Sequence, residues 1–476
     1  LPFLIGWLLV PAVTWKISLP YKGKANDLSE EQKKFLYKLS RKTWAFFENF
    51  VVSGDNWLPP DNYQESPVDR IAHRTSPTNM GLSLLANLTA WDFGYIPTEI
   101  LLERTSNSLH TMHRMERYAG HFYNWYDTET LEPMSPKYIS TVDSGNLAGH
   151  LLTLKQGLLA LGESPMVNSR MLRGLEDTLG VLMEKAENES LFQPFIADLQ
   201  AASSREWQTI LSSRDQLQQL SVRAEAFLPA TDPSTEAAWW ANALVRQIRE
   251  TLSDLYESAP WLLLSNFPIR FQSLENMLSR IMTLDETADL EQTVLPVIHA
   301  FTEDEISSEE KKWLETLRKQ VIETSRRAKE RLLTIQSLMK SCEEFADLKF
   351  DFLFDKSQRL LSIGYNVTDH RRDNSYYDLL ASESRLTIFV GIAQGKLMQD
   401  SWFALGRQLT NPGTSPVLVS WSGSMFEYLM PLLVMPNYDK TLLDQTYRTS
   451  VQKQIEYGRK RDVPWGVSES GYNMVD

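Results

Sequence analysis

Cysteine, metal-ligand motifs and phosphate-loop glycines are almost absent from this chain. One cysteine, Cys342, is present, so no disulfide framework can form within the chain, and its charged helical surroundings favour a structural role. There is no HExxH, paired CxxC or GxSxG motif, and GIAQGK (391–396) lacks phosphate-loop spacing. His110 and His113 share a helix face, but no further ligand cluster accompanies them. We therefore expect no metal ion and no cofactor.

Positive charge is also scarce. The 476 residues contain 48 Lys and Arg against 61 Asp and Glu, a net charge of −13. A nucleic-acid backbone needs a basic surface, so we expect no nucleic-acid partner, whereas a neutral substrate suits an acidic protein. Aromatic residues make up 11% of the chain, with 14 Trp and 17 Tyr, which favours surfaces on which rings can stack.

Long apolar runs are missing except at the start. Residues 1–15, LPFLIGWLLVPAVTW, are apolar throughout, slightly short of the roughly 20 residues that span a bilayer. The run lacks the basic region of a signal peptide. We interpret 1–20 as the tail of a transmembrane helix with Trp15 and Lys16 at the interface; the alternative is a buried hydrophobic arm.

Most of the remaining pattern is helical. Residues 28–51 open with Ser29 as a candidate N-cap and carry apolar residues at helical spacing. Further helices are predicted over 78–91, 97–117, 145–162, 376–398, 423–435 and 441–459. The loops 53–77 and 118–144 are too long to be mere connectors. Helices joined alternately by long loops indicate an all-α toroid with its site at the loop-bearing end.

Residues 166–345 differ in character, because charged residues, Leu and Ala dominate there. The apolar spacing over 306–345 predicts a long amphipathic helix with a coiled-coil-like seam, packed on helices within 200–225, 236–258 and 270–300. We interpret this region as a helical insertion that serves as scaffold or docks a partner. Residues 350–367 then alternate like a small β-hairpin with a DKSQ turn.

Five blocks combine aromatic rings, amides, Arg and carboxylates: 73–82, 121–157, 382–385, 421–431 and 465–473. A sugar site needs this mixture of flat faces for pyranose C–H groups, forked donors and acceptors, and acids. Glycoside cleavage requires one carboxylic acid to protonate the leaving oxygen and a second carboxylate as nucleophile or base.

Two acids each occupy the centre of a Ser-Glu-Ser triplet. Glu383 begins a predicted helix, where a charge favoured by the helix dipole is the alternative to catalysis. Glu469 lies in WGVSESGYN, where a solvated loop acid is the alternative. Glu427 in MFEYLMP is a third candidate. Asp143 in TVDSGN is either a helix N-cap or an acceptor for a sugar hydroxyl.

Around these acids we predict a set of substrate-binding side chains, although core packing is the alternative for any single aromatic residue. The set is Arg74, Asn124, Trp125, Tyr126, Asp143, Tyr377, Arg385, Trp421, Glu427, Tyr428, Trp465 and Tyr472.

The blocks AHRTSPTNMGL, GHFYNWYDTETLEPMSPKYISTVDSGNLAGHL, DNSYYDLLASESRL, SWSGSMFEYLMP and VPWGVSESGYN resemble the cyclization (glycoamylase-like) domain of bacterial cyclic β-1,2-glucan synthases. The resemblance covers about 25–165 and 346–476. It implies an (α/α)6 barrel that closes linear β-1,2-glucan into a ring by transglycosylation. Matching motifs make Glu469 the nucleophile and Glu383 the acid/base.

The resemblance also implies a context. Members are inner-membrane proteins in which a glycosyltransferase domain precedes the barrel and a phosphorylase-like domain follows it. We therefore expect a membrane helix tail (1–20), a first barrel part (21–165), the insertion (166–345) and a second barrel part (346–476). The barrel would be truncated at its C-terminus and lie on the cytoplasmic side of a bacterial inner membrane. The alternatives are an endo-β-1,2-glucanase or glucoamylase-like hydrolase and a noncatalytic glucan-binding module.

Overall fold

The computed structural model describes residues 10–11, 14–15, 28–65, 68–204, 207, 209–228, 232–264, 267–303, 305–380, 382–411, 416–466 and 468. The predicted membrane tail, 1–20, falls largely outside these residues. Within the described part of the chain, no helix combines the length and the apolar character needed to cross a bilayer.

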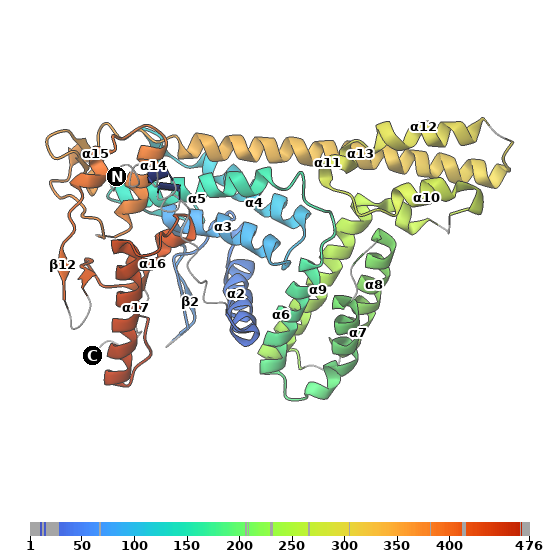
Figure 1. Ribbon diagram of the computed structural model, residues 1–476, viewed down its shortest axis with the longest axis horizontal. Coiled ribbons are helices and arrows are strands. Elements are labelled where there is room, and N and C mark those ends of the chain that lie inside the picture. The colour runs from blue at the N-terminus through green and yellow to red at the C-terminus, as the bar shows by residue number, and fades with distance from the viewer. Residues whose placement is uncertain are drawn as a thin grey trace, which may run out of the picture.

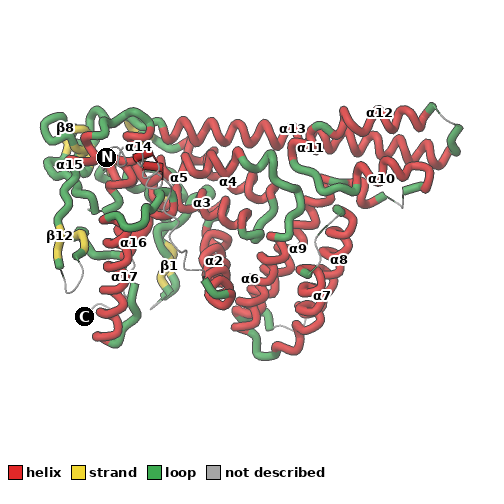
Figure 2. The backbone as a smooth tube through the Cα atoms, in the orientation of Figure 1, coloured by secondary structure: helices red, strands yellow, loops and turns green. Residues whose placement is uncertain are grey.

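Helices make up most of the described chain, as predicted (Figures 1 and 2). The helices are α2 (Glu30–Phe50), α3 (Pro77–Asp92), α4 (Thr98–Arg114), α5 (Thr141–Leu159), α6 (Arg170–Lys185), α7 (Gln193–Ser203), α8 (Ile210–Phe227), α9 (Glu236–Ser258), α10 (Gln272–Leu278), α11 (Leu284–Ala288), α12 (Leu290–Thr302), α13 (Ser308–Ala346), α14 (Ser384–Ala393), α15 (Asp400–Ala404), α16 (Met425–Leu429) and α17 (Leu442–Arg461). Closure of these helices into a six-pair barrel stays a prediction.

The strands are two or three residues long and pair antiparallel. They are β1 (Tyr63–Gln64) with β2 (Arg70–Ile71), β3 (Arg74–Thr75) with β6 (Tyr126–Asp127), β4 (Arg117–Tyr118) with β5 (His121–Phe122), β8 (Phe354–Asp355) with β9 (Leu360–Leu361), β12 (Leu409–Thr410) with β13 (Val417–Leu418), and β10 (Gly364–Asn366) between β7 (Tyr138–Ser140) and β11 (Arg371–Arg372).

The predicted hairpin over 350–367 is confirmed in its first half only. β8 and β9 pair across the DKSQ turn, where Asp355 accepts the backbone N–H of Ser357 at 2.8 Å. β10 instead pairs with β7, more than two hundred residues earlier in the chain. This pairing joins the first and last thirds of the sequence beside the start of α5.

Helix α5 lies at the centre of one core and packs against α3, α13 and α14. The close contact with α14 depends on Gly145, because a Cβ atom there would lie 2.5 Å from the Cα atom of Thr387. The side chains that face the predicted site from α5 are therefore carried by a helix enclosed on several sides.

The buried apolar side chains form two clusters. One gathers residues between Trp44 and Leu161 with the C-terminal half of α13 and the segments after it. The other gathers residues between Val167 and Val321. Helix α13 contributes to both: it packs on α4 and α5 near its C-terminal end, on α11 near its middle and on α12 toward its other end, as Figure 1 shows along the top of the molecule.

The long helix over 306–345 is confirmed, and so is most of its predicted seam. Its expected partners are partly wrong. α11 and α12 pack on it, but α8 packs on α7 and α9 instead, because α6 to α9 form their own layer beside α13 (Figure 1).

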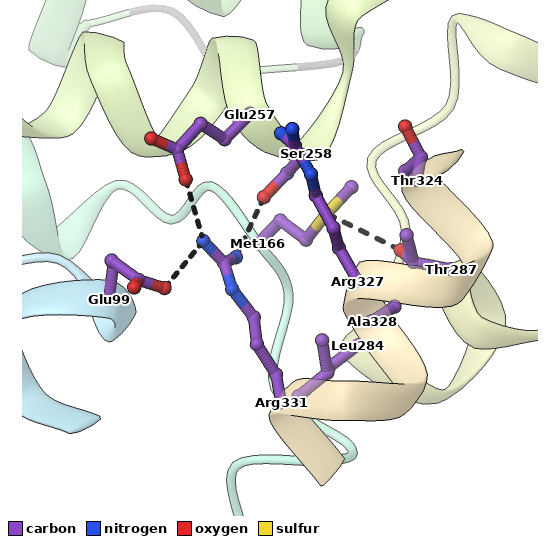
Figure 3. Close-up of a pocket in the computed structure, with 10 residues that line it drawn as sticks. All are labelled: Glu99, Met166, Glu257, Ser258, Leu284, Thr287, Thr324, Arg327, Ala328 and Arg331. Atoms are coloured by element: carbon purple, nitrogen blue, oxygen red, sulfur yellow. Dashed lines mark hydrogen bonds and ion pairs between the residues drawn. The ribbon is translucent and has the colours of Figure 1, made fainter. Parts of the chain in front are cut away.

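The two cores meet at a polar junction around a cavity of about 150 Å³ (Figure 3). Arg331 of α13 pairs with Glu99 of α4 at 2.7 Å and with Asp254 of α9 at 2.8 Å, and it donates to Ser258 at 3.0 Å. Burial raises the pKa of Asp254, and the Arg331 charge opposes that shift. The guanidinium thus connects three helices from the two cores.

Two predicted helix ranges are wrong: the helix expected over 376–398 is shorter at both ends, spanning Ser384–Ala393, and the helix expected over 423–435 is interrupted. The helix over 376–398 begins only at Ser384, because Ser382 adopts a left-handed conformation with φ of 51°. The helix over 423–435 becomes α16 and a short 3-10 turn at Met430–Leu433, where Pro431 supplies no backbone N–H.

Candidate active site

The candidate site lies where the start of α5, the start of α14, and α16 with the turn before it meet. In Figure 2 this is the left end of the molecule, where loops are densest. The first two turns of α5 carry Asp143 and Asn146, and Glu383 is the N-cap residue of α14. Residues from four of the five sequence blocks therefore come together here.

Glu383 is almost fully buried, with 4% of its surface exposed. Its Oε2 atom accepts hydrogen bonds from Ser382 Oγ at 3.0 Å and from Asn146 Nδ2 at 3.4 Å. Burial raises the pKa of Glu383 to about 7, even though the hydrogen bonds from Ser382 and Asn146 favour the ionised form. A carboxyl group that holds and releases a proton near neutral pH is suited to general acid/base work.

Asp143 is not the N-cap of α5, contrary to one of the two predictions for it. The cap is Ser140, whose hydroxyl oxygen accepts the Asp143 backbone N–H at 3.3 Å. The Asp143 carboxylate accepts a 2.6 Å hydrogen bond from Thr78, and Asn124 donates to it at 2.9 Å when its amide is oriented to satisfy its neighbours. Burial raises the pKa of Asp143 as well.

Thr78 and Asn146 connect the two acids. Asn146 Nδ2 donates both to Thr78 Oγ1 at 3.1 Å and to Glu383 at 3.4 Å, while the Thr78 hydroxyl donates to Asp143. Asn146 is fully buried within an otherwise largely apolar helix. Asn146 was not among the predicted site residues, although a polar residue one turn after Asp143 lies on the same helix face.

Glu427 is a buried carboxylate whose acceptor positions are largely filled. Its Oε1 atom accepts the Ser382 backbone N–H at 3.0 Å, and its Oε2 atom accepts the N–H and O–H of Ser422 at 3.0 and 2.7 Å. Burial acts to raise the pKa of Glu427, but the hydrogen bonds from Ser422 and its neighbours outweigh burial and lower it. A permanently ionised, enclosed carboxylate is a poor proton donor.

Aromatic rings border this polar network. The Trp421 ring lies 5.1 Å from that of Tyr377 and is 57% exposed. Burial and the charges of Asp143 and Glu383 raise the pKa of Tyr377. Such a pair of rings offers an apolar face to a pyranose next to an acid.

A second aromatic ring, that of Trp125, contacts Arg74 and Asn124. The Arg74 guanidinium lies 4.9 Å from the centre of the Trp125 ring, and it pairs with Asp61 at 2.9 Å. The Trp125 indole N–H donates to Asn124 at 3.1 Å, which links this ring to Asp143. Asp61 was not singled out from the sequence.

Three of the predicted substrate-binding side chains are enclosed in the framework, and their contact with a substrate stays a prediction. Tyr126 is fully buried and donates to the carbonyl of Glu116 at 2.6 Å. Arg385 is fully buried and donates to the carbonyls of Glu427 and Tyr428 at 2.8 and 2.7 Å. Tyr428 is 7% exposed, and its hydroxyl donates to a main-chain carbonyl.

The last block is described only in part, and Glu469 and Tyr472 lie outside the described residues. Trp465 is 53% exposed and lies beside Gly458 of α17. The Gly466 N–H donates to Gln454 Oε1 at 3.2 Å, and Gln454 Nε2 donates to the carbonyl of Gly423 at 2.7 Å. Gln454 therefore connects the segment after α17 to the turn that bears Trp421.

No known family profile matches the chain. Among solved structures, an endo-β-1,2-glucanase from Chitinophaga pinensis is 18% identical over 32% of this chain and 37% of its own, with a TM-score of 0.23. A glucoamylase candidate from Bacteroides fragilis NCTC 9343 is 16% identical over 33% and 38%, with a TM-score of 0.24. Superpositions this partial carry no conclusion about fold or function.

The sequence comparison reaches further. The chain is 35% identical over 503 residues to the cyclic β-(1,2)-glucan synthase NdvB of Rhizobium meliloti (strain 1021), and the match takes in 100% of this chain. It spans 15% of NdvB. The resemblance that the motifs predicted is confirmed: from end to end, the chain is similar to one segment of a cyclic β-1,2-glucan synthase.

Proposed function

We propose that this chain closes linear β-1,2-glucan into a ring by retaining transglycosylation, as one part of a cyclic β-1,2-glucan synthase. The observation that carries the proposal is the Glu383 carboxyl, whose burial raises its pKa to about 7 beside exposed aromatic faces. The similarity to NdvB supports β-1,2-glucan as the substrate class.

In this proposal Glu383 is the acid/base and Glu469 is the nucleophile. Protonated Glu383 gives its proton to the departing glycosidic oxygen while the Glu469 carboxylate attacks the anomeric carbon, forming a glycosyl ester. Ionised Glu383 then takes a proton from a hydroxyl at the non-reducing end of the same glucan. That oxygen displaces Glu469, and two inversions give net retention.

Ring closure requires the tethered hydroxyl to compete successfully with water. Tethering raises the effective concentration of the acceptor. The exposed Trp421 ring and the half-buried rings of Tyr377 and Trp125 offer surfaces that hold sugar rings and reduce the access of water. Asp143 and Asn124 lie beside them with polar groups suited to sugar hydroxyls.

The cellular setting is part of the proposal. The apolar segment 1–20 would attach the domain to a bacterial inner membrane with the site on the cytoplasmic side. A neighbouring glycosyltransferase domain of the same polypeptide would supply the linear glucan. A phosphorylase-like domain would follow the cyclization domain.

The test is product analysis of the full-length protein supplied with linear β-1,2-glucan. Products that resist an exo-acting glucosidase support cyclization, whereas new reducing ends support the hydrolase. Glu383→Gln and Glu469→Gln should both abolish turnover, and Glu456→Gln, an exposed acid on α17, should not. Normal turnover by both of the first two variants would refute the assignment and leave a noncatalytic glucan-binding module.

A further inference from the structure

Glu427 connects two structural features that lie on different segments of the chain. One oxygen holds the backbone N–H of Ser382, the residue before Glu383. The other oxygen holds Ser422, the residue after Trp421. The carboxylate is 4% exposed, so both connections are made away from solvent.

The Ser382 connection restrains Glu383. Ser382 has a φ of 51°, a left-handed conformation that is unfavourable for serine and persists only where surrounding interactions hold it. In this conformation its N–H points to Glu427 while its hydroxyl donates to Glu383 at 3.0 Å. A charge-assisted hydrogen bond to an ionised carboxylate is the kind strong enough to hold such a residue.

The Ser422 connection restrains Trp421. The turn after the ring includes Gly423 with a φ of 72°, and the Gly423 N–H donates to Ser420 Oγ at 2.8 Å. Two hydrogen bonds from Ser422 to Glu427 attach this turn to α16. The Trp421 ring, 57% exposed and packed on Tyr377, therefore depends on Glu427 for its place.

Arg385 makes the connection rigid. It lies two residues after Glu383, is fully buried, and donates to the main-chain carbonyls of Glu427 and Tyr428. The guanidinium fixes the backbone of α16 against α14, so the Glu427 carboxylate projects from a restrained backbone.

We propose that Glu427 is a positioning residue that couples the Trp421 ring to the Glu383 carboxyl. A sugar that stacks on Trp421 orders the 420–423 turn, and the same carboxylate then holds Ser382 in the conformation that orients Glu383. This inference rests on the proposed acid/base role of Glu383, and it assigns Glu427 no contact with the substrate.

The test uses Glu427→Gln in the full-length protein. Glutamine keeps the size but replaces one acceptor oxygen with an NH2 group, so either Ser382 or Ser422 loses its partner. We expect the KM for linear β-1,2-glucan to rise about tenfold, as for a lost stacking surface. The kcat should fall about 100-fold, as for a misplaced catalytic group. Glu456→Gln, an exposed acid on α17, should leave both unchanged.

A double-mutant cycle separates coupling from general damage. In a Trp421→Ala background, Glu427→Gln should no longer raise KM, because the ring through which it acts is gone. An equal rise in KM in both backgrounds would overturn the proposal. If Glu427→Gln does not fold by circular dichroism, Ser422→Ala decides, since it removes only one donor to Glu427; an unchanged KM for that variant also overturns the proposal.

The pH dependence of kcat/KM separates a misplaced Glu383 from a general loss of stability, because instability alone does not shift it. The Ser382 hydrogen bond lowers the pKa of Glu383, so loosening Ser382 should shift the alkaline limb of kcat/KM to higher pH. The other groups that act on Glu383 are Asn146 and Asp143 on α5 and Arg385 on α14, and none of them is altered.

Failure of the coupling and failure of the proposed function give different results. Normal turnover by Glu383→Gln refutes the function itself. If Glu383→Gln is inactive, the affinity for glucan is measured for the Glu383→Gln variant and for the double variant that also carries Glu427→Gln. Equal affinities then refute the coupling alone.

Discussion

Replacing Asn146 with leucine isolates one of the interactions that set the pKa of Glu383. Leucine fills nearly the same space, so the buried carboxyl gains no water. The variant removes the 3.4 Å hydrogen bond that favours ionised Glu383. Thr78 loses one bond from Asn146 but still donates to Asp143.

The size of the effect follows from the geometry. A hydrogen bond to a charged group contributes roughly 1.5–3 kcal/mol, and a 3.4 Å bond lies at the weak end of that range. One pKa unit corresponds to about 1.4 kcal/mol. The alkaline limb of kcat/KM for glucan cyclization should therefore move upward by about 1 pH unit, from a starting value near 7.

The assay is the rate of cyclic product formation by the full-length protein at low glucan concentration across pH 5–9. The matched control is Asn79→Leu, which removes an amide–carboxylate bond of the same 3.4 Å length, to Asp61. The control should leave the alkaline limb in place even if it weakens glucan binding. An alkaline limb of kcat/KM that is unchanged or shifted to lower pH in Asn146→Leu would refute the assigned role of Asn146.

Three further predictions concern stability. The raised pKa of Glu383 makes its ionised form unfavourable in the folded state, so stability is lost as pH rises from about 4.5 through about 7. Glu383→Gln should therefore raise the free energy of unfolding by up to about 3 kcal/mol at pH 8 and by little at pH 4. Equal effects at the two pH values in urea titrations would contradict this. Arg331→Met leaves Asp254 buried without its partner and should lower the free energy of unfolding by about 3–5 kcal/mol in denaturant titrations. The control Arg326→Met, an exposed position on the same helix, should lower it by less than about 0.5 kcal/mol. Similar losses for the two variants would argue against a stabilising role for the Arg331 junction. Gly145→Ala places a methyl group against the α14 backbone and should lower the free energy of unfolding by about 1–3 kcal/mol, with an unchanged melting temperature as the contrary result.

The helices were the most predictable part of the chain, because their signals are local. Ser29 was expected to cap the first helix, and its hydroxyl oxygen accepts the Gln32 N–H at 3.2 Å within a capping box. The long helix of the insertion followed from regular apolar spacing. The start of α14 was missed because the left-handed Ser382 is held by Glu427, 45 residues away, which no local pattern reveals.

Residue types predicted the site region better than the role of each side chain. Glu383, Asp143 and Trp421 stand out because they lie in blocks that combine acids and rings with Ser, Asn and Gly. Tyr126 and Arg385 belong to the same blocks but are buried. Whether a polar or aromatic side chain faces the core or a substrate depends on contacts with distant segments. Asn146 was overlooked because one amide among several polar residues of a helix carries no signal that separates a site contact from packing.

Helix α13 has a mechanical consequence for the site. Its 39 residues include neither proline nor glycine, so it is an uninterrupted rod of roughly 58 Å. One end packs on α12, the middle packs on α11, and the other end lies along α5, which bears Asp143 and Asn146. A force that tilts the far end must bend the rod or slide it over α5, so strain applied to the insertion reaches the helix on which the two site residues stand.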